Sequence, residues 1–266
     1  MVAIIDHRYL QELRKLPFCY SCAQIFATNE VRTRDHVPPS SCFAIEDRIR
    51  PVIVPAHDVC NASYKASDEL VGQFISLRRG KTPPSARSRR MTFREFRTPN
   101  LETHVAIDNV DIRGAVERWV RAMHAALYRE PLVPATRFGI ETPFAIAVPT
   151  HTGGVGLDPG RITQHRLFVE VLKESRGLGN IDRVVANNGK FRYECVWDQA
   201  TNKNWMCMFA LDIYDWKDLG RTSLGPKKGC VGFYQYLLPD PPAKATKRSP
   251  LKSTATNLEP LDPFGR

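Results

Sequence analysis

The chain has 266 residues, of which 42% are hydrophobic and 25% are charged, a composition typical of a globular protein. No apolar run approaches the ~20 residues of a membrane-spanning helix, and residues 1–8 lack the features of a signal peptide. The sequence therefore predicts a cytoplasmic, intracellular protein with no membrane partner. The formal net charge of +10 predicts a polyanionic partner, most simply nucleic acid.

Short elements are expected in the first third of the chain. Leucines three residues apart favour a short helix over residues 6–16, which Pro17 ends. Residues 31–37, which carry Asp35 and His36, are expected to form a short strand, and the apolar residues 51–55 a second one. A helix follows Cys60 directly. Read together, these elements predict strand, strand and helix around a metal site.

Residues 78–100 differ sharply from what precedes them, because they are polar, basic and proline-containing. This composition favours a linker or an exposed arm. Eight basic residues and one acid lie between residues 78 and 97, which gives this segment a charge of +7. A solvated tether and an arm in contact with phosphate both fit this charge. The residues predicted to bind nucleic acid are Lys65, Arg78, Arg79, Lys81, Arg87, Arg89 and Arg90.

The rest of the chain predicts a mixed helix and antiparallel-sheet domain. The clearest helix covers residues 111–130, where apolar residues recur three or four apart before Pro131. The other predicted elements are strands at 144–148, 191–197, 205–213 and 231–238, and a helix or strand at 162–172. Residues 239–266 are rich in proline, lysine and serine, so we expect a disordered basic tail.

Seven cysteines are an odd number for a disulfide framework, and a chain of this size does not need one. Cys19 and Cys22 form one pair separated by two residues, and His57 and Cys60 form another. Thiolates and an imidazole at these spacings can close a tetrahedral structural zinc site. Two alternatives remain open: Cys42 could replace His57 as the fourth ligand, or all the cysteines could be buried thiols.

An Asp35-His36 dipeptide lies between the two pairs, and Asn61 follows the last ligand. Oxygen donors such as those of Asp35 and Asn61 suit a hard cation, Mg²⁺ or Mn²⁺, whereas zinc should stay on sulfur and nitrogen. His36 can accept a proton from water near neutral pH. The predicted centre therefore combines a structural zinc, a catalytic divalent ion and a general base.

The arrangement of Cys-x-x-Cys, Asp35-His36 and a second ligand pair before Asn61 resembles the HNH nucleases, also called the ββα-metal or His-Me finger family. The likeness is closest to the zinc-stabilised branch and covers residues 17–76. It implies that His36 activates water, that Asp35 and Asn61 bind the catalytic ion, and that DNA is cleaved. The sequence departs from the family at His57, where cysteine is usual, and at Arg50-Pro51-Val52, where many members carry a further asparagine.

The expected fold class is α+β, with a zinc-stapled ββα-metal module at residues 1–77 and a basic linker at 78–100. A C-terminal domain of unknown role covers 101–238, and the tail covers 239–266. The expected function is a divalent-metal-dependent DNA endonuclease. A zinc-containing nucleic-acid-binding module without catalysis is the main alternative, and a purely structural zinc module is the third. DNA is the expected partner, and whether the chain forms a homodimer stays open.

Overall fold

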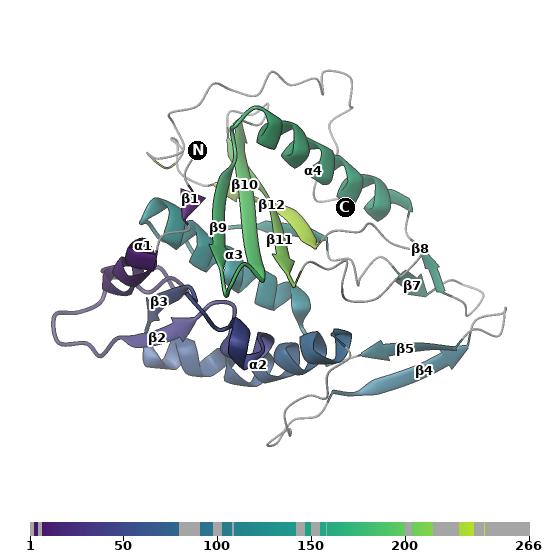
Figure 1. Cartoon of the computed structure of the whole chain (residues 1–266), viewed down its shortest axis with the longest axis horizontal. Helices are drawn as coiled ribbons and strands as arrows, with labels where there is room; N and C mark the ends of the chain where they lie inside the picture. Colours follow the sequence, from purple (N-terminus) through teal and green to yellow (C-terminus); the bar gives the residue numbers. More distant parts are fainter. Residues whose placement is uncertain are drawn as a thin grey trace.

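The computed structural model describes residues 3–4, 7–79, 91–97, 103–107, 109–141, 147–149, 155–157, 159–199, 204–214, 229–236 and 242. These residues form a mixed α+β structure (Figure 1). None of the described helices has the length and apolar content needed to cross a membrane. Apart from residue 242, the predicted tail at 239–266 lies outside the described residues, and so does the whole of the segment 80–90.

The N-terminal part is built from short elements around one long helix. The elements are β1 (Ala3–Ile4), α1 (His7–Glu12), η1 (Leu13–Lys15), β2 (Thr33–His36), η2 (Ser40–Cys42), η3 (Ile45–Asp47), β3 (Ile53–Ala56) and α2 (Asp58–Arg78). Strands β2 and β3 pair antiparallel, with His36 opposite Ile53 and Thr33 opposite Ala56. The order β2, β3, α2 follows the sequence prediction. Gly72 lets η2 approach α2, because a Cβ there would lie 2.6 Å from the Ser41 side chain.

The C-terminal part is a larger sheet with helices on its faces. Its elements are β4 (Phe93–Arg97), β5 (Thr103–Ile107), α3 (Ile112–Tyr128), β6 (Phe138–Glu141), β7 (Ala147–Pro149), β8 (Val155–Leu157), α4 (Pro159–Gly177), β9 (Asp182–Ala186), β10 (Phe191–Gln199), β11 (Trp205–Ile213) and β12 (Cys230–Tyr236). The described strands of the large sheet run in the order β1-β9-β10-β11-β12-β6. Only β1 joins its neighbour in parallel.

Alternation along the strands places the sheet between α3 and α4. Cys195 of β10 and Phe209 of β11 belong to the core cluster that contains α3, whereas Val196 and Met208 pack with α4 residues. Helix α4 covers the second face (Figure 1). The first of these clusters continues without a break into the N-terminal module, where it includes residues of α1, β3 and α2. The two predicted domains therefore share one hydrophobic core.

The structure assigns several elements that the sequence left ambiguous and changes one. Residues 162–172, predicted as helix or strand, lie within helix α4. Helix α3 begins where the Asp111 carboxylate accepts a hydrogen bond from the Gly114 N–H at 2.8 Å, and Arg129 follows it in the left-handed conformation. Residues 93–97, inside the segment expected to be a linker, form β4 and pair with β5. The rest of the linker prediction lies largely outside the described residues.

His124, at the centre of α3, is fully buried and hydrogen-bonded, as expected of a histidine that is not a ligand. Its Nδ1 lies 2.8 Å from the Tyr234 hydroxyl and its Nε2 lies 3.2 Å from a Glu130 carboxylate oxygen. Burial lowers the pKa of His124 below 6.5, an effect that the hydrogen bond to Glu130 only partly opposes. The imidazole is therefore neutral in the folded protein at neutral pH.

We expect this histidine to make stability depend on pH. As the pH falls below 6.5 the unfolded chain binds a proton at His124 before the folded protein does, so the free energy of unfolding decreases. The slope contributed by one such group reaches at most about 1.4 kcal/mol per pH unit. Urea unfolding between neutral and mildly acidic pH should show a smaller decrease in His124→Gln than in the wild type. Equal decreases in the two proteins would contradict the assignment.

Candidate functional site

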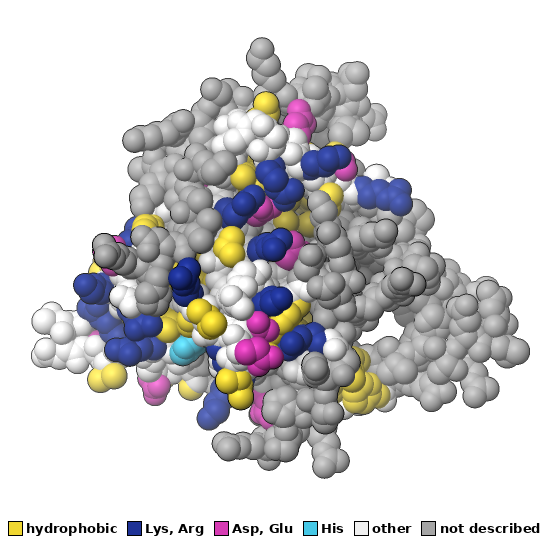
Figure 2. Space-filling view, viewed as in Figure 1, with side chains coloured by type: hydrophobic (Ala, Val, Ile, Leu, Met, Phe, Trp, Pro, Cys, Tyr) yellow, Lys and Arg dark blue, Asp and Glu magenta, His cyan; other side chains and the backbone are white. Residues whose placement is uncertain are grey.

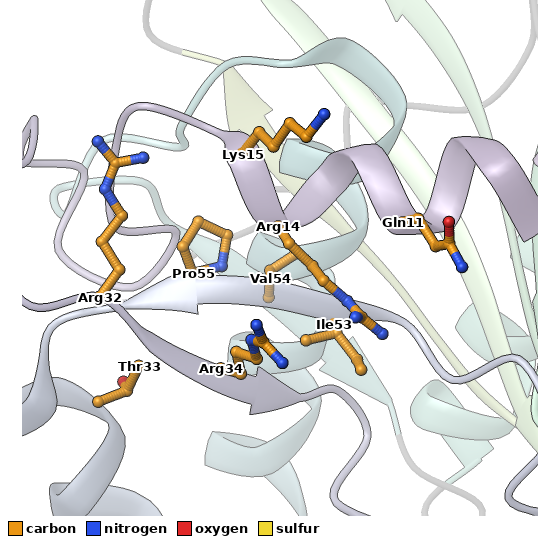
Figure 3. A pocket seen from close by; sticks show the side chains of 9 residues that line it. All are labelled: Gln11, Arg14, Lys15, Arg32, Thr33, Arg34, Ile53, Val54 and Pro55. Carbon is orange, nitrogen blue, oxygen red and sulfur yellow. The ribbon is translucent and has the colours of Figure 1, made fainter.

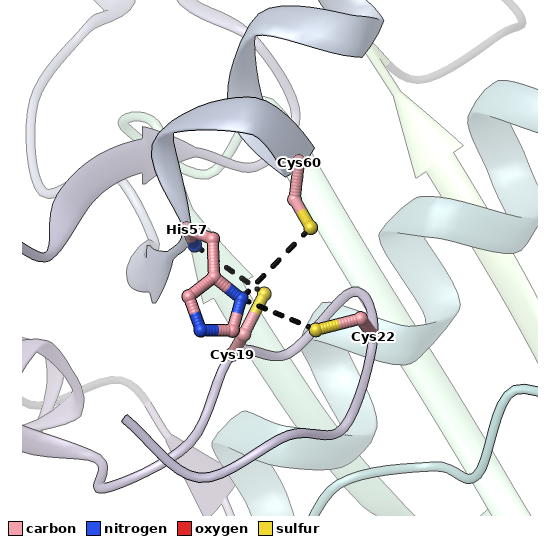
Figure 4. Close-up of side chains that lie close together, drawn as sticks. All are labelled: Cys19, Cys22, His57 and Cys60. Carbon is pink, nitrogen blue, oxygen red and sulfur yellow. Dashed lines mark hydrogen bonds between the residues drawn. The ribbon is translucent and has the colours of Figure 1, made fainter. Parts of the chain in front are cut away.

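The four predicted zinc ligands lie together at one end of the N-terminal module (Figure 4). Cys19 and Cys22 lie in a tight turn after η1, in which Ala23 has a φ of 67° and donates its N–H to the Cys19 carbonyl at 2.9 Å. His57 is the N-cap of α2 and Cys60 lies in its first turn. All four ligand atoms lie within 4.8 Å of one another. The sequence prediction of a Cys₃His cluster is confirmed.

The spacing of these atoms fits a zinc ion. The Nδ1 atom of His57 lies 3.2 Å from the Cys22 sulfur and 4.0 Å from the Cys60 sulfur. Zinc bonds of about 2.3 Å to sulfur and about 2.0–2.1 Å to nitrogen place tetrahedral ligand atoms roughly 3.5–3.8 Å apart, which these distances bracket. Cys42 is buried elsewhere, beside Ser41, and is not part of the cluster. The preference for His57 over Cys42 as fourth ligand is therefore confirmed.

Glu30 completes the surroundings of the cluster, and the sequence analysis did not identify it. Its carboxylate lies 3.2 Å from Nε2 of His57, so the outer nitrogen can donate to Glu30 while Nδ1 faces the sulfurs. Histidine ligands of metals commonly hold their second N–H on a carboxylate in this way, which fixes the tautomer. A lone glutamate eight positions after Cys22 gives no sequence signal, because only folding brings it to His57.

The thiols of the cluster affect one another. Burial, followed by the neighbouring thiols of Cys19 and Cys22, raises the pKa of Cys60 to about 12. Three adjacent thiolates repel one another and lose hydration, so a divalent cation is the natural compensation for their charge. The donor set, its spacing and the orientation of His57 agree on a cation at this position. Cys19, Cys22, His57 and Cys60 would hold it.

Asp35 lies on the inner face of β2, with an exposed fraction of 5%. Its carboxylate accepts a short hydrogen bond from the Tyr20 hydroxyl and lies 3.8 Å from a guanidinium nitrogen of Arg118 on α3. Arg118 also forms a two-point ion pair with Asp68 of α2. Burial is the main cause that raises the pKa of Asp35, while Arg118 opposes it. Asp68 thus pairs with Arg118.

His36 lies on the other face of β2, because adjacent strand residues point to opposite sides. It is half-buried, and burial is the main cause that lowers its pKa below 6.5. Arg14 and Arg48 lower the pKa further, and the Asp35 carboxylate opposes them. The imidazole is therefore uncharged at neutral pH and has a nitrogen able to accept a proton.

Asn61 lies in the first turns of α2, where its N–H donates to the His57 carbonyl at 2.9 Å. Among the described residues, no hydrogen bond joins its side chain to Asp35 or His36. The structure thus places Asp35 and His36 side by side in one strand but on opposite faces, with Asn61 on the adjoining helix. The convergence of all three on a catalytic ion stays a prediction.

The predicted nucleic-acid-binding residues are only partly described. Lys65 is exposed on α2. Arg79 is half-buried and its guanidinium lies 3.8 Å from the ring centre of Tyr214, so it packs against the C-terminal part. The side chain of Arg78 and the residues Lys81, Arg87, Arg89 and Arg90 lie outside the described part of the chain, and their role stays a prediction.

A cavity of about 550 Å³ is lined in part by the β2–β3 pair and includes Ile53, the residue that pairs with His36 (Figure 3). Its residues come from α1, from η1 and from the two strands. They are Gln11, Arg14, Lys15, Arg32, Thr33, Arg34, Ile53, Val54 and Pro55. Arg34 shares the outer face of β2 with His36, two positions away. Four cations and no acid line this cavity, and no signal in the sequence analysis had grouped them.

Comparison with models of protein families, with curated proteins and with solved structures gives no match to this chain.

Proposed function

We propose that this protein is a divalent-metal-dependent endonuclease of the HNH type that hydrolyses phosphodiester bonds of DNA. The observation that carries the proposal is the position of the Cys₃His cluster. The cluster joins the turn at Cys19 and Cys22 to the start of α2, and β3 leads directly into His57. The strand β2, paired with β3, then presents a neutral, half-buried imidazole at His36. The sequence motif that resembles the HNH family supports the same assignment.

The proposed chemistry assigns one role to each group. A zinc ion held by Cys19, Cys22, His57 and Cys60 has a structural role, because all four positions of a tetrahedron are taken by protein atoms. His36 accepts a proton from the water that attacks phosphorus, the bond from phosphorus to the 3′-oxygen breaks, and that oxygen takes a proton from solvent, so the products are a 5′-phosphate and a 3′-hydroxyl. A Mg²⁺ or Mn²⁺ ion on Asp35 and Asn61 would neutralise charge on the phosphate. The oxygen donors suit that ion, but the Asp35 carboxylate is turned toward Tyr20 and Arg118, so this part rests on the family resemblance.

The ion pair between Asp35 and Arg118 favours a second candidate function. Because Asp35 is buried against Arg118, the module can be a zinc-stapled nucleic-acid-binding unit in which the carboxylate only holds the fold. The positive charge of the chain fits this role equally well. Only the nuclease would cleave DNA, so a cleavage assay distinguishes the two candidates.

The test is incubation of the purified full-length protein with supercoiled plasmid and Mg²⁺ or Mn²⁺. We expect nicking, and we expect His36→Ala to reduce its rate by about 10²–10⁴-fold, the usual contribution of a general base. His124→Gln, a histidine substitution remote from the module, should retain the wild-type rate. Zinc content and thermal unfolding should be unchanged in His36→Ala, because the side chain is not a ligand.

Two outcomes would overturn the nuclease proposal. Equal nicking by wild type and His36→Ala would point to a contaminating nuclease or to a different catalytic group. Salt-sensitive DNA binding without cleavage under any of these conditions would favour the non-catalytic module. A parallel reaction with single-stranded RNA separates a DNA nuclease from an RNA nuclease.

A further inference from the structure

We propose that the cavity beside β2 and β3 binds the phosphate backbone of a nucleic acid strand. The bound phosphate would be the neighbour of the phosphate that faces His36. This inference rests on the proposed function and extends it, because it names the residues that hold the substrate. It also places the main nucleic-acid contact in this cavity, whereas the sequence predicted that contact chiefly in the segment 78–100. The four residues that would contact phosphate are Arg14, Lys15, Arg32 and Arg34.

The first observation is the uncompensated charge of the cavity. Arg14 and Lys15 come from η1, Arg34 comes from β2, and Arg32 directly precedes β2. Within the described part of the chain, none of these four cations forms an ion pair with a carboxylate. Figure 2 shows Lys and Arg side chains gathered at the left of the molecule, over the region of α1, β2 and β3, with few acidic side chains between them. Such a concentration of one sign attracts a polyanion.

The second observation is an unsatisfied donor. The Nε atom of Arg14 is buried and has no hydrogen-bond partner among the described residues. A buried donor without a partner loses its hydration and gains nothing in return. Arg14 and Arg34 lie over the strand at Ile53 and line the same space, whereas Lys15 and Arg32 extend outward (Figure 3). An anionic oxygen in this space would lie beside the Arg14 and Arg34 guanidinium groups and would compensate the charge of the half-buried Arg14 side chain.

The third observation is the position relative to His36. Residues two apart on one strand face lie roughly 6.6–6.8 Å apart, so Arg34 and His36 can meet neighbouring phosphates of a single strand. Four of the nine lining residues are cationic, and the three apolar ones, Ile53, Val54 and Pro55, offer no side-chain hydrogen bonds. The cavity therefore recognises phosphate charge rather than base sequence, as contacts to the backbone do.

The test measures binding rather than cleavage, so that it is independent of catalysis. A fluorescein-labelled DNA oligonucleotide is titrated with the full-length protein in the His36→Ala background, without added Mg²⁺ or Mn²⁺. We expect Arg14→Gln/Arg34→Gln to weaken binding by roughly 10-fold or more, because hydrogen bonds to charged groups contribute at least about this much. The slope of log affinity against log salt should fall by about 0.7–0.9 for each phosphate interaction that the substitutions remove.

A matched control removes the same charge elsewhere. Lys173→Gln/Arg192→Gln replaces two exposed cations of α4 and β10 and should leave the affinity and the salt slope nearly unchanged. Arg34→Gln alone keeps the test valid if removal of the half-buried Arg14 side chain impairs folding, because Arg34 is exposed. Zinc content of each variant reports whether the module remains folded.

The outcomes separate the inference from the proposed function. Equal decreases of affinity in the cavity and control variants would overturn the inference, because they would show that only total charge matters. An unchanged affinity in the cavity variant would overturn it as well, even if the wild type cleaves DNA. A selective decrease in the cavity variant supports the inference even if no cleavage is found, and in that case only the nuclease proposal fails.

Discussion

Replacement of Cys60 by alanine is expected to abolish zinc binding and to unfold the N-terminal module. The module has two strands of four residues each and one long helix, and the cluster joins the loop before β2 to that helix. Structural zinc sites contribute on the order of 10 kcal/mol to the folding of small domains, so few other contacts here can replace it. Wild-type protein should contain one zinc per chain by elemental analysis, and Cys60→Ala should contain none.

The matched control is Cys42→Ala. Cys42 is a thiol of the same module, but it is fully buried and lies outside the cluster, so its removal costs only packing. It should keep zinc, and hydrogen exchange should remain slow in β2 and β3. In Cys60→Ala, exchange should become fast across residues 18–61, while the sheet formed by β9, β10 and β11 stays protected. Retention of zinc by Cys60→Ala would show that other residues hold the ion.

Replacement of Arg118 by leucine is expected to destabilise the fold by about 3–5 kcal/mol, because it leaves buried carboxylates without their partner. Arg118 has an exposed fraction of 3%, pairs with Asp68 on α2 and lies near Asp35 on β2. Its guanidinium also lies 4.5 Å from the ring centre of Tyr64. One side chain of α3 thus links the strand and the helix of the N-terminal module. Thermal and urea unfolding measure the destabilisation directly.

Two further variants test whether the destabilisation arises from the loss of the Arg118 ion pairs. Arg113→Gln removes an arginine of the same helix whose side chain is 62% exposed and pairs with Glu117, and its effect should stay below about 1 kcal/mol. The double variant Arg118→Leu/Asp68→Asn also removes the Asp68 charge that Arg118→Leu leaves without a partner. It should therefore be more stable than Arg118→Leu. A destabilisation in Arg118→Leu no larger than that in Arg113→Gln would show that the ion pair contributes little to the fold.

The structure connects these two results. A zinc ion bound by the Cys₃His cluster would hold the turn at Cys19 and Cys22 to the start of α2, and Arg118 holds β2 and α2 to α3. The backbone adds further links, because the N–H groups of Asn187 and Asn188 donate to the carbonyls of Arg50 and Ile49. The C-terminal sheet therefore supports the module in addition to any ion that the Cys₃His cluster would bind. We expect a fragment that ends near residue 79 to fold less stably than the module does in the whole chain.

The ligand set and the larger elements could be read from the sequence because their signals are local. Two pairs with two intervening residues each have the spacing of a zinc site, and this spacing survives any later packing. Apolar residues three or four apart predicted α3, alternation predicted β10, and an apolar run after a hairpin connection predicted β11 as its buried partner strand. The short strands β6 and β9 were not predicted, because their few residues show no clear period and, unlike β2 and β3, they do not lie between the two ligand pairs.

The roles of Glu30, Arg118 and the cavity arginines depended on tertiary structure. Glu30 meets His57, and Arg118 meets Asp35 and Asp68, across separations in sequence that no local pattern encodes. Asp35 and His36 are neighbours in the chain, yet the alternation of a strand directs one to a buried ion pair and the other to the cationic face. The sequence by itself determined which residues can bind a metal or accept a proton. Only folding decided which of them face solvent, because burial and ion pairing arise between distant segments.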